Sequence, residues 1–220
     1  MEPLAWWLSI KLAACTTLIL LVVGLPVAYW LSQTQWRGKF LLEAVLSLPL
    51  VLPASVLGFY ILQFTSPRGA FGGWIERVTG STIPFTFNGI LLASVIYNIP
   101  HSIRPFLAAF QAVDRRLCEA SWCLGVSRFE TFRRVIVPLA WPGILAGLIL
   151  TFAHTLGEFG IVLMVGGNIP GVTRTLSITI YDDVHALDYA SAGRTAFCLL
   201  AVSFVVLCAT HWLQRKPPLP

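Results

Sequence analysis

The sequence predicts an all-α integral membrane protein with five transmembrane helices, and three observations support this prediction. Hydrophobic residues make up 56% of the 220 residues and charged residues only 11%, whereas soluble domains are about 45–50% apolar and about 25% charged. Five segments are long and apolar enough to cross a bilayer, which takes ~20 helical residues. Tryptophan and tyrosine occur at several segment ends, as expected at the depth of lipid headgroups.

The apolar segments follow one another without an internal repeat, a low-complexity run or a soluble domain, so we predict one transmembrane domain over residues 1–220. We predict spans at about 4–31, 44–64, 89–110, 137–156 and 195–213. Pro49 and Pro53 predict a kink in the second span. After the fourth span the apolar run continues to Val165 and contains Gly157 and Gly160, two positions that permit a bend.

The distribution of basic residues predicts the orientation of the chain, because cytoplasmic loops are enriched in Lys and Arg. One side carries Arg37, Lys39, Arg115, Arg116, Arg128, Arg133, Arg134, Arg215 and Lys216. The other side carries only Arg68, Arg77, Arg174 and Arg194. We therefore predict an external N-terminus, a cytoplasmic C-terminus and a cytoplasmic loop at 112–136. We expect the basic residues behind the net charge of +5 to contact membrane lipid. No nucleic-acid partner is expected.

Several kinds of chemistry have no sequence support. The chain lacks the GxxxxGK[ST] loop that cradles ATP phosphates, an HExxH zinc motif and paired carboxylates for acid–base work, so an enzyme is not predicted. No cysteine pair has CxxC spacing, so neither disulfides nor a metal site is expected. The four histidines are spread along the chain, and we predict isolated polar contacts for His101, His154, His185 and His211.

The cytoplasmic loop contains two short helices with specified ends. Asp114 is placed to cap the first helix, and Gly125 supplies the left-handed residue that ends it. Ser127 and Glu130 form a capping-box pattern that starts the second helix, which Pro138 is expected to close. A weakly apolar stripe on the first helix consists of Leu117, Ala120, Ser121 and Leu124. Physical chemistry alone leaves two readings open: a connector that rests on lipid headgroups, or a docking surface for a cytoplasmic partner.

The same loop resembles the EAA loop of ABC importer permeases, which reads EAAxxxG followed by IxLP. Here Glu119-Ala120-Ser121 precedes Gly125, and the segment Val135-Ile136-Val137-Pro138 follows, with Ser in place of Ala and Val in place of Ile and Leu. The resemblance implies that the first helix is a coupling helix seated in a cleft of a separate ATPase, which uses ATP and Mg²⁺. The coupling residues implied are Glu119, Ala120, Ser121, Leu124, Gly125, Val126 and Ser127.

From about Trp7 to Trp212 the chain resembles the oxyanion branch of these permeases, in which SLPLVLP, LGEFG, GNIPG, TRTL and DYA recur in this order. It is most similar to molybdate permeases, with sulfate and thiosulfate permeases as near relatives. The resemblance implies the type I ABC importer permease fold in the bacterial inner membrane. It also implies a homodimer around a translocation path, two cytoplasmic ATPase subunits, an external or periplasmic binding protein, and no cofactor on this chain. Molybdate, tungstate, sulfate and thiosulfate are not separated by these residues.

Polar residues within or beside the apolar runs are the candidates for a path or gate. Glu158, between Gly157 and Gly160, lies either within the membrane, where a carboxylate needs partners or water, or at the outer interface. Arg104 either snorkels to the cytoplasmic interface or lines the path. In the outer loop, the candidate donors to a tetrahedral dianion are Asn168, Thr173 and Arg174.

A secondary transporter or channel is the alternative from another class, because Glu158 and Arg104 can serve ion coupling within a membrane. Such transporters commonly contain paired structural repeats, which this sequence does not show. A secondary transporter works by itself, whereas an importer permease transports nothing without its ATPase. Dependence on a partner therefore distinguishes the two classes.

Overall fold

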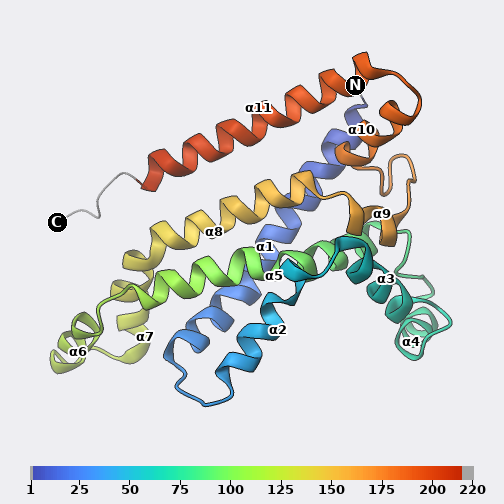
Figure 1. Cartoon of the computed structure of the whole chain (residues 1–220). Coiled ribbons are helices and arrows are strands. Elements are labelled where there is room, and N and C mark those ends of the chain that lie inside the picture. The colour runs from blue at the N-terminus through green and yellow to red at the C-terminus, as the bar shows by residue number, and fades with distance from the viewer. Residues whose placement is uncertain (1, 215–220) are drawn as a thin grey trace.

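The computed structural model describes residues 2–214, and this part of the chain is helical and contains no β-strand (Figure 1). The helices are α1 (Pro3–Gln33), α2 (Lys39–Val51), α3 (Ala54–Thr65), α4 (Ala70–Thr79), α5 (Phe87–Gln111), α6 (Arg115–Cys123), α7 (Arg128–Thr131), the π-helical segment η1 (Phe132–Ile136), α8 (Val137–Gly157), α9 (Gly160–Gly166), α10 (Leu176–His185) and α11 (Tyr189–Gln214). The all-α prediction is therefore confirmed.

Helix α5 is the centre of the bundle, where it packs against α1, α8, α2 and α9. Helix α11 contacts α8 and α10 and runs along the outside of the bundle (Figure 1). Figure 1 also shows α6 and α7 together at one end of the molecule, whereas α9, α10 and the N-terminus lie toward the other end. We call these the α6 end and the α10 end. The predicted cytoplasmic loop 112–136 forms the α6 end.

Two apolar cores stabilise the bundle. The core on the α6 side consists of Ala28, Leu31, Ile103, Phe106, Phe110, Cys118, Ile136, Ala140 and Ile144. The core on the α10 side consists of Leu12, Ile61, Ile90, Ala93, Ile161, Val162, Val165 and Ile178. Along α5, the buried polar residues Ser94 and Asn98 fall between the residues of the two cores. A polar layer therefore interrupts the apolar interior.

Three helical stretches of the described chain are long and apolar enough to cross a membrane: Pro3–Gln33, Arg128–Gly157 and Tyr189–Thr210. They coincide with the first, fourth and fifth predicted spans. The third predicted span, 89–110, corresponds to α5, a continuous helix of 25 residues that carries Pro100 and Pro105. The number of five spans stays a prediction.

The second predicted span, 44–64, is not one kinked helix, and this expectation is corrected. Helices α2 and α3 cover it and meet at an angle of 109°. The break lies at Leu52, which is extended (φ −74°, ψ 137°), and at Pro53, which precedes α3. Proline disfavours the helical conformation in the residue before it and has no N–H to donate, so the helix ends there.

The expectation that Pro138 closes the second loop helix is also wrong. The chain from Arg128 to Gly157 is helical throughout and passes through α7, η1 and α8. Pro138 lies in the first turn of α8, directly after the π-helical turn. A π turn bonds residues five apart and displaces the carbonyls that the proline ring would otherwise meet, so the helix continues without a stop.

Candidate functional site

The loop at the α6 end is held by hydrogen bonds at each helix terminus. The Asp114 carboxylate accepts from the N–H of Arg116 at 2.9 Å, and the Ser127 hydroxyl accepts from the N–H of Glu130 at 3.2 Å. Gly125 has φ +80°, the left-handed conformation predicted for it. The Glu130 carboxylate lies 2.7 Å from Arg134. Both predicted caps are therefore present, while the Glu130 side chain is engaged along its own helix.

Helix α6 is attached to the bundle by its inner face. The hydroxyls of Ser121 and Thr131 are buried and 2.9 Å apart, which joins α6 to α7. Cys118 from α6 and Ile136 from η1 are part of the apolar core on the α6 side. The ring of Tyr29 in α1 lies 4.5 Å from the ring of Phe132. The loop is therefore a packed unit that contacts three long helices, rather than a loose connection.

The outer face of the loop is apolar and exposed. Leu124 is 83% exposed and Phe129 74% exposed, and Glu119, Ala120 and Ser127 also face outward. Of the predicted coupling residues in this loop, Ser121 is buried, Val126 is half-buried, and the others are exposed: Glu119, Ala120, Leu124, Gly125 and Ser127. Large apolar side chains exposed together are typical of a surface that another protein covers.

The inner face of α6 carries a thiol that stays neutral. Burial raises the pKa of Cys118, and the carboxylates of Asp114 and Glu119 raise it further, whereas Arg115 acts in the opposite direction. Each effect has the expected sign, because burial and nearby negative charge both disfavour a thiolate. Cys118 therefore packs as a small apolar residue.

A second site lies in the interior, around Glu158. This residue is only 4% exposed and occupies the break between α8 and α9. Its Oε2 accepts a 2.5 Å hydrogen bond from the Ser94 hydroxyl, and its Oε1 accepts one from the Asn98 amide. His154 Nδ1 lies 3.0 Å from Asn98 Oδ1 and 3.7 Å from Glu158 Oε1. Glu158 is therefore a buried, hydrogen-bonded carboxylate, and its position within the membrane rather than at the outer interface stays a prediction.

Two histidines extend this polar cluster, so the prediction of isolated histidines is wrong for them. The rings of His101 and His154 stack with centroids 3.8 Å apart, and the ring of Tyr97 lies 5.4 Å from that of His154. A pattern in the sequence indicates this cluster. Ser94, Asn98 and His101 recur at i, i+4 and i+7, which places them on one helix face, and His154 and Glu158 are also four residues apart. We call Ser94, Asn98, His101, His154 and Glu158 the polar cluster.

A cavity of about 280 Å³ adjoins the polar cluster and is lined by Tyr97, His154, Gly157, Glu158 and Gly160, among others. A Cβ atom at Gly157 would meet nothing within 4 Å, whereas one at Gly160 would lie 3.3 Å from the Cβ of Ala54 in α3. Gly160 therefore allows α9 to approach α3 closely. Gly157 borders open space beside the carboxylate.

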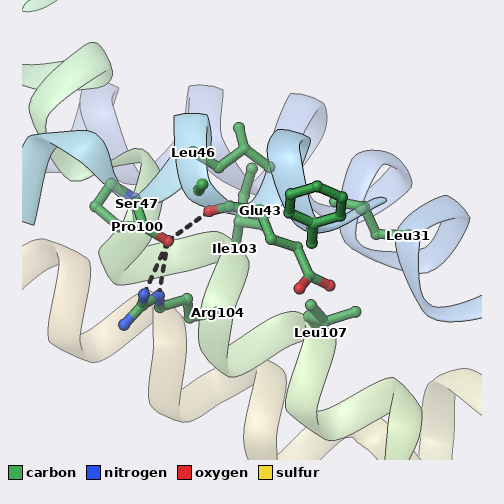
Figure 2. Close-up of a pocket in the computed structure, with 10 residues that line it drawn as sticks. Leu31, Glu43, Leu46, Ser47, Pro100, Ile103, Arg104 and Leu107 are labelled. Atoms are coloured by element: carbon green, nitrogen blue, oxygen red, sulfur yellow. Dashed lines mark hydrogen bonds between the residues drawn. The ribbon is translucent and has the colours of Figure 1, made fainter. Parts of the chain in front are cut away.

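Arg104 makes its side-chain hydrogen bonds outside the polar cluster, in a pocket between α2 and α5 (Figure 2). Its Nε and Nη2 atoms both donate to the Ser47 hydroxyl, at 3.1 and 2.8 Å. The pocket has a volume of about 310 Å³ and also includes Glu43. The structure therefore assigns Arg104 to a different part of the bundle from Glu158.

The outer-loop donors that we expected to face an anion are engaged within the protein. Arg174 donates to Asn168 Oδ1 at 2.6 Å and lies 3.4 Å from Glu2 and 3.7 Å from Asp182, while Asn168 donates to Asp182 at 2.7 Å. Thr173 is buried and donates to a backbone carbonyl. These contacts connect the start of α1 to the loop before α10. All three candidate donors therefore have hydrogen-bond partners within the described part of the chain.

The chain is similar to known transport proteins. Residues 15–217 match the family described as "Binding-protein-dependent transport system inner membrane component". The chain is 46% identical over 208 residues to the molybdenum transport system permease protein ModB of Azotobacter vinelandii, covering 94% of this chain and 92% of that relative. It is 35% identical over 209 residues to ModB of Escherichia coli K12, covering 94% and 91%. A probable sulfate transport system permease, cysT of Chlorella vulgaris, is 32% identical over 210 residues, covering 96% and 79%.

Solved structures show the same fold. A chain of the inward-facing MetNI methionine ABC transporter superposes with a TM-score of 0.74 at 18% identity, covering 98% of each chain. A bacterial ABC transporter involved in alginate import gives a TM-score of 0.72 at 16% identity, covering 96% of this chain and 79% of that one. The fold is thus that of type I ABC importer permeases. The chain belongs to the family of inner-membrane components of binding-protein-dependent transport systems.

Proposed function

We propose that this chain is the membrane-spanning permease subunit of an ATP-driven oxyanion importer and that its cargo is molybdate. The observation that carries the proposal is the 46% identity to the Azotobacter molybdenum permease over nearly the full length of both chains. The matches to sulfate permeases are weaker, at 32%, so sulfate or thiosulfate, and tungstate as a close analogue of molybdate, are the alternative cargoes. The chain is a transport subunit and not an enzyme.

The partners follow from the same proposal. Two copies of a cytoplasmic ATPase, which uses ATP and Mg²⁺, dock on two copies of this chain, and an external or periplasmic binding protein delivers the anion. The chain lies in the bacterial inner membrane with its N-terminus outside and its C-terminus in the cytoplasm, which makes the α6 end cytoplasmic. The exposed side chains of Leu124 and Phe129 and the basic residues of the α6 end support this orientation.

Coupling to the ATPase runs through α6. The Ser121–Thr131 hydrogen bond transmits a displacement of α6 to α7. From there a continuous helix of 30 residues, Arg128–Gly157, extends to the residue before Glu158, and 30 residues of helix span roughly 45 Å. A rigid helix of this length moves at both ends together. A displacement of the ATPase-facing loop therefore also displaces the polar cluster at the other end of this helix.

The polar cluster, at the end of this helix away from the loop, acts as the gate. Glu158 does not bind the anion, because a carboxylate repels an oxyanion. Instead it holds the α8–α9 break against α5 through Ser94 and Asn98. The cavity beside Gly157 gives the break room to move. Gly160 keeps α9 close to α3. Asn168 helps to hold the outer loop that follows α9.

The test is ATP-dependent uptake of labelled molybdate into vesicles that contain this chain, its ATPase and its binding protein, with sulfate and tungstate as competitors. Uptake that requires all three components and resists excess sulfate is expected. If sulfate abolishes uptake, the assignment as a permease holds and the assigned cargo changes. Uptake by the chain alone would overturn the proposal in favour of a secondary transporter or channel.

A further inference from the structure

The pocket between α2 and α5 presents the exposed guanidinium of Arg104, which Ser47 orients and which has unused donors. The Ser47 hydroxyl donates to the backbone carbonyl of Glu43 at 2.6 Å, so its oxygen is free only to accept. It accepts from both Nε and Nη2 of Arg104 (Figure 2). Within residues 2–214, the Nη1 group of Arg104 has no hydrogen-bond partner. The pair of Nη atoms forms a fork, which is the geometry that binds two oxygens of an oxyanion.

The charge of Arg104 is not neutralised by its surroundings. Among the described residues no carboxylate lies within ion-pair distance of Arg104, and the acid of the same pocket, Glu43, lies 3.6 Å from Lys39. Lys39 and Glu43 offset each other, which leaves the pocket with one uncompensated positive charge. Arg174 at the α10 end is different, because two carboxylates surround it. Arg104 is thus suited to binding an anion, whereas Arg174 is not.

The position of Arg104 along α5 places it on the cytoplasmic side of the polar cluster. It is six residues beyond Asn98, or about 9 Å along the helix axis. It is also seven residues before the end of α5 at Gln111, or about 10 Å. The pocket volume of about 310 Å³ is at the lower end of ligand pockets, which are roughly 300–1,000 Å³, and it suits a small tetrahedral anion.

We propose that Arg104, oriented by Ser47, is a binding station for the transported tetrahedral oxyanion on the cytoplasmic side of the gate. This inference rests on the proposed function. Because the importer's cargo is negatively charged, an unpaired guanidinium on the cytoplasmic side lowers the free energy of the anion once it has passed the gate. The bond to Ser47 keeps the fork facing the pocket, so Ser47 is the positioning residue and Arg104 the ligand.

The first test compares Arg104→Gln and Arg104→Lys with the native chain in the three-component uptake assay. Loss of charge-assisted hydrogen bonds corresponds to about a tenfold or greater loss of binding, so Arg104→Gln should lower uptake by about that factor. Uptake by Arg104→Lys, which keeps the charge and loses the fork, should lie between that of Arg104→Gln and that of the native chain. The matched control is Arg194→Gln, because Arg194 also donates to a neutral oxygen, the carbonyl of Ala190 at 3.1 Å. Uptake should be normal in the control.

A charge-restoration test remains interpretable if Arg104→Gln folds poorly. Arg104→Cys is treated with a methanethiosulfonate that adds a trimethylammonium group or with one that adds a sulfonate group. The cationic reagent should restore uptake and the anionic one should not. The native chain, with its own five cysteines, receives the same reagents as a control. Equal effects of both reagents on Arg104→Cys, or native uptake rates in Arg104→Gln, would overturn the proposal.

A third test separates the cargo from a lipid phosphate as the anion. In lipid-free detergent, phenylglyoxal modification of Arg104 is followed by mass spectrometry with molybdate, with phosphatidylglycerol or with neither. Protection by molybdate supports the proposal, whereas protection only by the lipid assigns Arg104 to headgroup binding and overturns it. If the native complex transports sulfate instead of molybdate, the proposed cargo fails, yet a loss of sulfate uptake in Arg104→Gln still supports this site.

Discussion

The Ser94 hydroxyl on α5 donates a 2.5 Å hydrogen bond to the carboxylate of Glu158 at the break between α8 and α9. With the second bond from Asn98, this contact joins the central helix of the bundle to the end of the helical stretch Arg128–Gly157. In the proposed function it is the contact that links coupling to gating.

Glu158→Gln should lower uptake and destabilise the protein. Glu158 accepts from both Ser94 and Asn98, but a Gln amide accepts through one oxygen only, so either the Ser94 hydroxyl proton or the Asn98 N–H loses its acceptor. A buried donor left without an acceptor costs about 1–3 kcal/mol. Uptake and thermal unfolding of the purified chain measure the two effects. Glu76→Gln on α4 is the control, since Glu76 is exposed, and unchanged uptake and stability in Glu158→Gln would show that the carboxylate is not part of the gate.

Gly125→Val should uncouple ATP hydrolysis from uptake. A Cβ atom at this position meets nothing within 4 Å, so there is room for a side chain, but φ is +80°. The left-handed conformation costs other residues roughly 1–2 kcal/mol, and Asn tolerates it best. Gly125→Asn is therefore the matched control and should keep coupling. The measurement is the amount of ATP hydrolysed per anion taken up, and equal ratios in Gly125→Val and the native chain would contradict the assignment of this turn to coupling.

Glu119→Lys should weaken docking of the ATPase while membrane insertion stays normal. Glu119 is exposed on α6 and pairs with Arg115 at 3.1 Å, so the substitution replaces an attraction by a repulsion on the proposed docking face. Co-purification of the ATPase with the permease measures docking. The same reversal on α4, Glu76→Lys, lies outside this face and should leave co-purification unchanged. Equal recovery of ATPase with both variants would place the docking surface elsewhere.

The two cysteines of α6 should differ in reactivity. Cys123 is exposed, whereas Cys118 is buried and has a raised pKa. Because the thiolate is the reactive form, a raised pKa keeps Cys118 protonated and unreactive at neutral pH. A maleimide should label Cys123 at pH 7 and label Cys118 only at higher pH or after denaturation, as followed by mass spectrometry. Equal labelling of both in the native protein would mean that α6 does not pack on the bundle as described.

Features that depend on neighbouring residues were predicted correctly from the sequence. Asp114 and Ser127 cap their helices and Gly125 adopts positive φ, because caps and turns involve residues only a few positions apart. The long apolar runs likewise predicted α1, α8 and α11, since a helix satisfies its own backbone hydrogen bonds within a membrane whatever surrounds it.

Other features were decided by the tertiary structure. Glu158 and its partner Ser94 are 64 residues apart in sequence, and no local pattern states which of the polar residues in two spans will meet. The stack of His101 on His154 and the pocket around Arg104 arise in the same way, from the packing of α5 against α8 and α2. Two prolines show the same limit, because Pro53 lies at a full break between α2 and α3 where a kink was predicted, and Pro138 is accommodated after a π turn where a helix end was predicted. The sequence alone therefore determined the class of protein and the caps of the two loop helices, while side-chain partners across helices required the fold, since burying a charge is favourable only where the packed neighbours supply its hydrogen bonds.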